Sequence, residues 1–193
     1  MVSSAQFLSL ALRIPSSRAN GPGERAVIWV QGCSLACPGC YNPHTHPFGQ
    51  GKRVSVPSLT GWLRGLPPSL EGLTISGGEP FQQAPALSAF LAVVRAQTRL
   101  SILVFSGYEL AELAALQSAS SALAQIDVLI AGRYQAGKRL ASGLVGSANK
   151  TTHFLTSRYS PADLLAIPDA EAWIEPDGQI LLSGINPLTW PNQ

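Results

Sequence analysis

Three cysteines lie within eight residues, in Cys33-Ser-Leu-Ala-Cys37-Pro-Gly-Cys40, and the 193-residue chain has no others. An odd, clustered set of thiols makes a poor disulfide framework and indicates a metal site in a reducing compartment. Three thiolates can hold three corners of a [4Fe–4S] cube, whose usual complement is four cysteines. Without a fourth cysteine, one iron would stay open to a substrate or cofactor.

Zinc is the alternative metal for this segment. His44 and His46 follow the last cysteine, and Cys-x3-Cys-x2-Cys-x3-His could supply a Cys₃His zinc site. The cluster is the favoured interpretation, and three buried thiols without a metal are the third. Gly32, Pro38 and Gly39 suit a loop that folds tightly around a cluster and leaves backbone N–H groups free to bond to sulfur.

A second candidate constellation is Ser76-Gly-Gly-Glu-Pro80. Gly77 and Gly78 would let the backbone approach a ligand closely. The Glu79 carboxylate could accept hydrogen bonds from an ammonium group. Pro80 fixes the turn and can open the next helix. Taken alone, the segment could equally be an ordinary strand-to-helix turn.

Alternating strand-type and helix-type segments predict how these residues are positioned. The fold class that they indicate is α/β with a mostly parallel sheet, because the strand runs are apolar on both faces. A turn at Pro176-Asp177-Gly178 predicts a C-terminal β-hairpin at a sheet edge. We expect a single domain over 1–193, with a core of about 16–160 and a hairpin extension of about 170–185. The predicted strands are Gln6–Ile14, Ala26–Gln31, Leu73–Ser76, Leu100–Phe105, Ile126–Ala131, Thr152–Leu155, Ala172–Glu175 and Gln179–Ser183; the helices are Ser58–Leu66, Ala84–Thr98 and Glu109–Ala124; Pro15–Glu24 is a loop.

Four unusual loops follow four of these strands. Active groups of α/β sheets lie beyond the C-terminal strand ends, so we expect one composite site there. Taken singly, three segments are more readily structural: Ser106-Gly107-Tyr108, Gly132-Arg133-Tyr134 and the later Val145–Lys150. The loops are the cysteine segment, Ser76–Pro80, Ser106-Gly107-Tyr108 and Gly132-Arg133-Tyr134.

Charge and hydropathy exclude some classes of protein. The net charge of +2 is too weak to imply a nucleic-acid partner. Five basic residues and no acid lie between Val128 and Ala162, which predicts either a solvated face or a wall for an anionic group. No apolar run approaches the ~18 residues of a membrane helix. No basic residue precedes Arg13, unlike in a signal peptide, so we expect a cytoplasmic protein that binds no membrane.

The order of the motifs resembles the radical S-adenosylmethionine (SAM) superfamily. Cys-x3-Cys-x2-Cys follows a first strand, and Gly-Gly-Glu-Pro follows a second. Further segments look most like the activating enzymes of anaerobic ribonucleotide reductase, which are glycyl-radical activases. The resemblance runs from about Ser16 to Gly184, and it makes zinc a minor alternative. These segments are Asn20–Arg25, Trp29–Cys33, Cys40–Pro43, Phe105–Tyr108 and Gly146–Asn149.

The resemblance implies an incomplete (β/α)6 barrel and a set of cofactor ligands. Cys33, Cys37 and Cys40 would hold the cluster, whose open iron is chelated by the amino and carboxylate groups of SAM. Glu79 would bind the methionine amino group with its neighbours. Ser106 and Arg133 would contact the ribose or carboxylate, and Tyr41 would approach the adenine or shield the cluster. The remaining cofactor-binding candidates are Gly77, Gly78, Pro80 and Asn149.

The resemblance also implies an activity. Reduction of the cluster cleaves SAM to methionine and a 5′-deoxyadenosyl radical, which abstracts a hydrogen atom from a glycine of a partner enzyme. A flavodoxin or ferredoxin would supply the electron. The chain departs from relatives at Ala131, where Asp is frequent, at Lys150, where Gln is common, and in its hairpin. These departures leave the SAM chemistry intact but keep open a radical SAM enzyme that acts on a peptide or small molecule. A further alternative of a different class is a non-catalytic iron–sulfur or zinc module, which has no evident need for Glu79.

Overall fold

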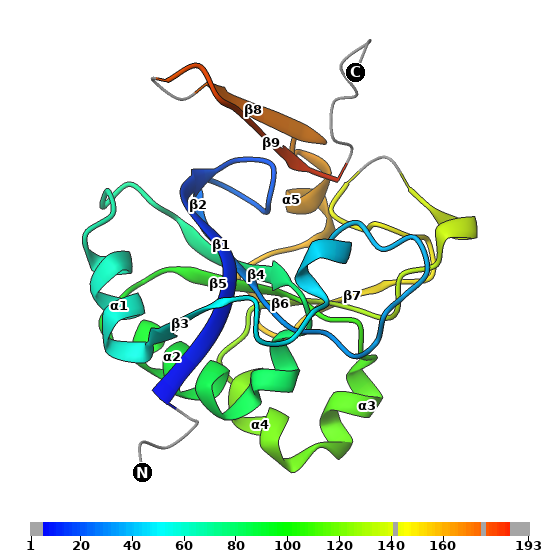
Figure 1. Ribbon diagram of the computed structural model, residues 1–193, viewed down its shortest axis with the longest axis horizontal. Helices are drawn as coiled ribbons and strands as arrows, with labels where there is room; N and C mark the ends of the chain where they lie inside the picture. The colour runs from blue at the N-terminus through cyan, green and yellow to red at the C-terminus, as the bar shows by residue number, and fades with distance from the viewer. Residues whose placement is uncertain (1–5, 141–142, 175–176, 186–193) are drawn as a thin grey trace.

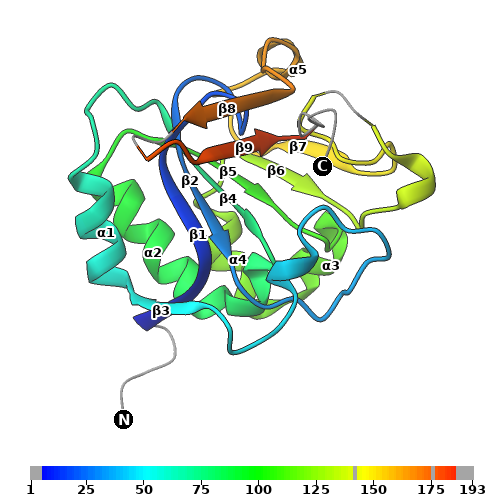
Figure 2. The same cartoon turned by 45° about the horizontal axis from the view of Figure 1, so that its top comes forward.

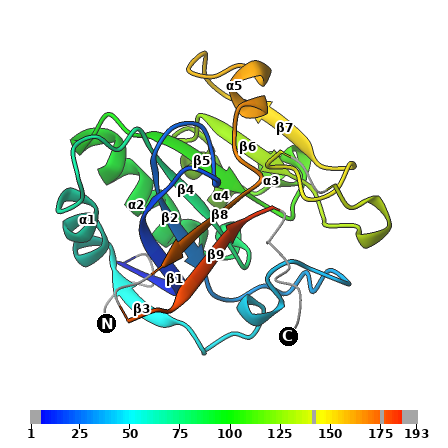
Figure 3. The ribbon, with the colours of Figure 1, turned by 90° about the horizontal axis from the view of Figure 1, so that it is seen from above.

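The chain folds around one seven-stranded sheet with the strand order β3-β1-β2-β4-β5-β6-β7 (Figure 1). The computed structural model describes residues 6–140, 143–174 and 177–185. Helices α1 to α4 cover one face, and the β8–β9 hairpin crosses the other (Figures 2 and 3). The strands are β1 Phe7–Ser17, β2 Arg25–Val30, β3 Lys52–Ser55, β4 Gly72–Gly77, β5 Ser101–Phe105, β6 Val128–Ala131, β7 Thr151–Phe154, β8 Ala170–Ile174 and β9 Ile180–Gly184; the helices are α1 Val56–Arg64, α2 Ala84–Gln97, α3 Leu110–Ala115, α4 Gln117–Leu123 and α5 Pro161–Leu165.

Four central strands run parallel, as the sequence predicts. Strands β2, β4, β5 and β6 pair in register, with Ile28 beside Ile75 and Thr74 beside Leu103. Their residues are almost all buried, because the sheet is covered on both faces. The parallel direction places all four C-terminal ends at one edge of the sheet, and the loops with candidate chemistry leave from there.

The outer strands depart from the expected parallel order. Strand β7 pairs antiparallel with β6, because the connection from Gly132 to Lys150 contains no crossover and re-enters the sheet at the edge it left. Strand β1 is antiparallel to β2 and to β3, an edge strand that the sequence did not predict. Strand β1 continues through Pro15–Ser17, which we expected to lie in a loop. A register shift between Ile14 and Ser17 accommodates the proline.

The expected helix Glu109–Ala124 is broken into two. Leu116 adopts φ −90° and ψ 106°, which ends α3 and begins α4. In one straight helix, Leu113 and Ala119 would point about 120° apart, toward opposite margins of the face that covers the sheet. The break lets both side chains bury completely. None of the helices in the described ranges is long and apolar enough to span a membrane.

The C-terminal hairpin forms where it was predicted, but not at a sheet edge. Strands β8 and β9 make a separate two-stranded sheet. Polar side chains fix the hairpin across the sheet face: Glu171 accepts hydrogen bonds from Ser17 Oγ and from Arg18 N (2.8 Å). Asn20 Nδ2 donates to Ser183 Oγ over 2.7 Å. These bonds hold the hairpin over the sheet, and the edges of the main sheet are β3 and β7.

Candidate cofactor site

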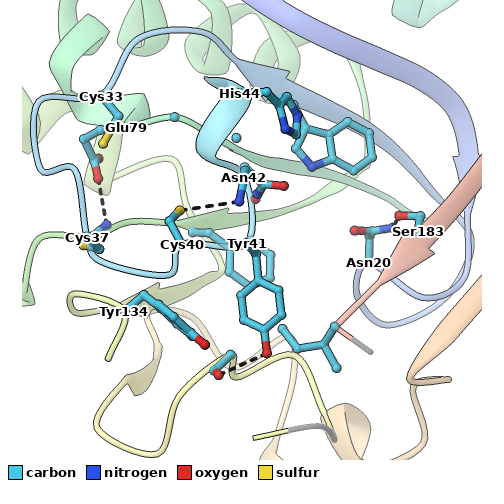
Figure 4. A pocket seen from close by; sticks show the side chains of 18 of the residues that line it. Asn20, Cys33, Cys37, Cys40, Tyr41, Asn42, His44, Glu79, Tyr134 and Ser183 are labelled. Atoms are coloured by element: carbon cyan, nitrogen blue, oxygen red, sulfur yellow. Dashed lines mark hydrogen bonds between the residues drawn. The ribbon is translucent and has the colours of Figure 1, made fainter. Parts of the chain in front are cut away.

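A cavity of about 450 Å³ opens at the C-terminal ends of the parallel strands. All three cysteines line it, together with Glu79, and Figure 4 shows these side chains on one side of the cavity. Ser106, from the loop after β5, lines it as well. The structure therefore brings together residues from the loops after β2, β4 and β5.

Backbone hydrogen bonds shape the cysteine loop. Gly32 N donates to Thr45 O (2.8 Å) and Cys33 N donates to His46 O (3.0 Å), so the segment closes on itself. Gly32 and Gly39 have φ angles of 103° and 71°, which favour glycine. These turns spread the three thiols along one wall of the cavity.

The thiols are half-buried and separate from one another. Burial raises the pKa values of Cys33 and Cys40, and Asn42 N donates to Cys40 Sγ over 3.4 Å. Across the described ranges, no three His, Cys, Asp or Glu side chains converge on a single metal position. A [4Fe–4S] cube binds each thiolate at a different iron, so three thiols that line one cavity can hold three of its corners. The donor set fits the cluster.

Glu79 is buried beside this loop and is 1% exposed. Its Oε1 accepts from Ser106 Oγ (2.9 Å) and Phe81 N (3.0 Å), and its Oε2 accepts from Gly107 N (2.7 Å). Burial raises the pKa of this carboxyl group, and the three donors and the Lys150 charge oppose the shift. A carboxylate offers about four acceptor positions. One position on Oε2 therefore remains for a donor from the cavity.

The two glycines before Glu79 allow a close approach, but to the protein's own backbone. A Cβ on Gly77 would lie 2.5 Å from Val30 O, and one on Gly78 would lie 2.4 Å from Gly32 O. Gly78 N donates to Val30 O (2.8 Å), and Glu79 N donates to Gly32 O (2.9 Å). The glycines thus fasten the end of β4 to the start of the cysteine loop and place Glu79 there. Both also line the cavity.

Lys150 supplies the cation of the site. Its Nζ donates to Ser106 O (3.3 Å) and to Gly132 O. Burial lowers its pKa, and the nearby charges of Glu79, Cys37 and Cys40 raise it. The residue noted in the sequence as a departure therefore lies close enough to the carboxylate and to two of the thiols to interact with their charges.

Tyr41 borders the cavity beside Tyr134. The two rings meet edge to face, with centroids 5.0 Å apart (Figure 4). Tyr41 Oη donates to Leu140 O over 3.2 Å, and the Arg139 guanidinium lies 5.2 Å from the ring centroid. These contacts hold the Tyr41 ring as one wall next to Cys40.

Three predicted cofactor-binding residues do not line the cavity. Pro80 opens the short 3-10 helix Pro80–Gln83, for which Glu79 is the N-cap. Arg133 pairs with Glu112 and packs its guanidinium on the Tyr108 ring at 5.4 Å. Asn149 Nδ2 donates to Arg133 O (2.8 Å), while its buried Oδ1 has no partner among the described residues. As placed, these three act on the cavity through their neighbours.

The basic segment does not form one anion-binding wall. Arg133 turns to Glu112, Arg139 to Tyr41, and Arg158 donates to Arg99 O (2.6 Å) at the opposite end of the sheet. Only Lys150 of the five basic residues lines the cavity in the part of the chain that is described. The solvated-face interpretation holds for the others.

Residues that no short motif identifies support the cysteine loop from outside the cavity lining. Two glutamines, Gln82 and Gln83, connect the cysteine loop to the loop after β4. Their side chains form hydrogen bonds with Gln31, Ser34 and Tyr108. Asn20, Trp29, Asn42 and Tyr134 line the cavity from segments that the sequence singled out, although it did not name them as ligands. Sequence spacing carried no signal for lining residues from more distant segments, which include Leu12, Ala19, Leu144 and Leu181–Ile185.

Three thiols and a buried carboxylate around one cavity define a single-cluster iron–sulfur protein. Residues 19–153 match the family model described as a 4Fe-4S single cluster domain. The chain is 34% identical over 150 residues to the anaerobic ribonucleoside-triphosphate reductase-activating protein of Vibrio cholerae, covering 74% of this chain and 95% of that protein. The Escherichia coli K12 protein of the same name is 32% identical over 148 residues, covering 73% and 95%.

Two more distant matches complete the comparison. The protein of that name from Enterobacteria phage T4 is 31% identical over 125 residues, covering 63% of this chain and 78% of the phage protein. The crystal structure of QueE from Escherichia coli superposes with a TM-score of 0.40 over 52% of each chain at 14% identity, which is too distant to bear on fold or function.

The chain therefore belongs to the family of anaerobic ribonucleoside-triphosphate reductase-activating proteins. The resemblance to radical SAM enzymes is confirmed, and a [4Fe–4S] cluster and SAM are the cofactors. Membership in this family and the match to a 4Fe-4S domain support an enzyme with an iron–sulfur cluster over a non-catalytic module or a zinc site.

Proposed function

We propose that this protein generates a glycyl radical on an anaerobic ribonucleotide reductase. The observation that carries the proposal is the cavity itself: three thiols and a buried carboxylate with one unused acceptor position share a single wall. That combination suits a cluster with one open iron and, beside it, the ammonium group of a bound amino acid. The named relatives activate a reductase of this kind.

The chain's own residues bind and orient the cofactors in this proposal. Cys33, Cys37 and Cys40 hold the cluster, and Glu79 accepts a hydrogen bond from the SAM amino group. When bound, the cluster supplies the electron that cleaves SAM and yields the 5′-deoxyadenosyl radical. Ser106 and Gly107 fix the Glu79 carboxylate, so that it needs no reorganisation when the ligand enters.

The remaining residues shape and close the cavity. Tyr41 and Tyr134 shield the cluster side from water, which protects a reactive radical from side reactions. Gly77, Gly78 and Pro80 position Glu79, while Arg133 and Asn149 support the loop that carries Lys150. Lys150 places a positive charge beside the thiolates and the SAM carboxylate.

The architecture and partners belong to the same proposal. The parallel strands β2, β4, β5 and β6 form part of an incomplete (β/α)6 barrel. The core and the hairpin together form one catalytic domain. A flavodoxin or ferredoxin in a reducing cytoplasm delivers the electron, because cluster potentials reach about −700 mV.

Electron paramagnetic resonance tests the proposal directly. The anaerobically reconstituted protein is mixed with SAM, dithionite and an anaerobic ribonucleotide reductase. We expect a glycyl-radical signal on the reductase and one 5′-deoxyadenosine per radical, neither of which the Cys37→Ala variant produces. If 5′-deoxyadenosine forms without any glycyl signal, the substrate is another peptide or a small molecule and the proposal is wrong.

A further inference from the structure

The far wall of the cavity is built by the C-terminal hairpin. Within the described part of the hairpin, only residues of β9 and its continuation, Leu181–Ile185, line the cavity. The matched family segment ends at residue 153, so this wall lies outside it. Figure 4 shows Ser183 across the cavity from the cysteines.

It is the edge of β9 that borders the cavity. Successive side chains of a strand point to opposite faces, so a strand that presented one face could contribute only every second residue. Leu181, Leu182, Ser183 and Gly184 all line the cavity. Four consecutive lining residues from β9, with none from the described residues of β8, indicate that the side of β9 away from β8, with its backbone groups, faces the cavity.

The hairpin's hydrogen-bond phase shows which backbone groups point outward. Ile185 N donates to Asp169 O over 2.9 Å, and paired residues of an antiparallel ladder alternate between bonded and non-bonded pairs. Ser183 and Leu181 therefore bond to β8, while Ile180, Leu182 and Gly184 direct their N–H and C=O groups away from it. Between residues 6 and 185, outside the two short gaps, none of these outward groups has a backbone partner beyond the hairpin.

The two faces of the hairpin differ in chemistry. Its inner face carries the polar anchors Glu171 and Ser183. Its outer face is apolar, and Ile174 and Ile180 are 77% and 57% exposed. An unpaired strand edge next to an exposed apolar face is the arrangement that binds extended polypeptide by strand addition.

We propose that the free edge of β9 receives the glycine-bearing segment of the protein substrate as an added strand. This inference rests on the proposed function, and it names how the substrate enters the same cavity. A strand along this edge runs past the residues that hold the cofactors, because β9 and the cysteines share one cavity. A glycine in the added strand has no side chain to keep its α-carbon away from the reaction centre.

Backbone methylation of a peptide tests strand addition without changing any side chain. The reconstituted protein with SAM is titrated with a fluorescent peptide of about ten residues, copied from the glycine segment of the reductase. Two further peptides carry N-methyl groups on the odd-numbered or on the even-numbered amides. An added strand uses every second N–H, so one methylated peptide should bind about tenfold more weakly and the other nearly as well as the parent.

Equal affinities of the three peptides, or equal losses in both methylated peptides, would overturn strand addition. The failure of the proposed function is a different result: the intact reductase would then acquire no glycyl radical from the wild-type protein. If the reductase is activated but its peptide binds equally well whatever the methylation pattern, the proposed function holds and only strand addition is wrong.

A matched pair of variants tests the protein side. Leu182→Ala and Leu182→Pro both remove the leucine side chain, and only the proline also removes an outward N–H, a loss that edge strands tolerate. We expect peptide affinity about fivefold lower in Leu182→Pro than in Leu182→Ala. Amide hydrogen exchange of the 170–184 segment reports whether the hairpin stays folded in each variant. Equal affinities in two folded variants would contradict the proposal.

Discussion

Two buried charges at opposite ends of the same sheet have opposite kinds of surroundings. Arg25 begins β2 and is 0% exposed, and every N–H of its guanidinium has an acceptor, among them Thr74 Oγ1 (2.8 Å) and Leu73 O (2.9 Å). Glu79 follows β4 and is 1% exposed, but it retains an unused acceptor position that faces a cavity. Burial of a charge alone therefore does not identify a functional residue in this protein; unused bonding capacity beside a cavity does.

The arginine should dominate stability. Arg25→Ala would leave buried acceptors on Thr74, Ser101 and Leu73 without donors and would open a cavity, so we expect the free energy of unfolding to fall by about 3–4 kcal/mol. Urea unfolding of the cofactor-free protein measures the loss. The control is Arg18→Ala, whose side chain is 70% exposed and pairs with Glu24 at 3.4 Å. That change should cost under about 1 kcal/mol, and similar losses in both variants would erase the contrast.

The glutamate should dominate ligand binding. Glu79→Gln removes the charge that faces the SAM ammonium group, and we expect SAM affinity to fall about tenfold or more while the iron content is unchanged. Anaerobic titration calorimetry of the reconstituted protein gives the affinity. Glu71→Gln, an exposed carboxylate at the Arg25 end of the sheet, is the matched control and should bind SAM normally. Unaltered affinity in Glu79→Gln would remove this residue from the site.

The cavity end of the sheet also depends on side-chain hydrogen bonds that fix the cysteine loop, for which the Arg25 end has no need. Gln82 Oε1 accepts from Ser34 N (3.0 Å), and its Nε2 donates to Ser34 Oγ (2.6 Å) and Tyr108 Oη (3.1 Å). We expect Gln82→Ala to loosen the cysteine loop and to speed cluster loss to a chelator about threefold, as each net hydrogen bond is modest. The decay of the charge-transfer absorption measures it. The exposed Gln97→Ala variant should lose its cluster at the wild-type rate. Equal rates of cluster loss in Gln82→Ala and Gln97→Ala would show that the Gln82 hydrogen bonds do not retain the cluster.

The smallest effect concerns pH. Burial raises the pKa of Glu79 above its ordinary value of 4.5, so the folded cofactor-free protein holds this proton more tightly than the unfolded chain. The corresponding stability is complete below a pH of 4.5 and is lost as the pH rises through the raised pKa. The amide that Glu79→Gln introduces cannot titrate. We therefore expect the wild-type free energy of unfolding to decline relative to that of Glu79→Gln as the pH increases. Parallel pH profiles in denaturant unfolding would contradict a raised pKa.

Local patterns predicted the parallel core well because they depend on nearest neighbours. Apolar runs buried on both faces identified β2, β4, β5 and β6, and the proline-glycine turn identified the hairpin. Sequence reasoning failed where distant packing decides. It missed β3, which has only four residues, and it continued one helix through Leu116, where the backbone turns between the fully buried Leu113 and Ala119.

The candidate site divides in the same way. Cysteine spacing and the Gly-Gly-Glu-Pro order were readable without any coordinates, because the chemistry needs those residue types within a few positions of one another. The placements of Arg133 and Asn149 outside the cavity were not readable, because each depends on which neighbour it meets: Glu112 and the Arg133 carbonyl.

The sequence by itself determined the donor set, the parallel strands that carry it and the family to which the chain belongs. Only the tertiary structure decided that Glu79 is buried with one acceptor position unused, that Lys150 lines the same cavity as Glu79 and the thiols, and that a hairpin from beyond residue 160 forms one wall of the cavity. The physical reason is how far apart in the sequence the interacting residues lie. Residue type and local spacing fix covalent and nearest-neighbour chemistry, whereas burial, electric fields and free strand edges arise only when distant segments pack.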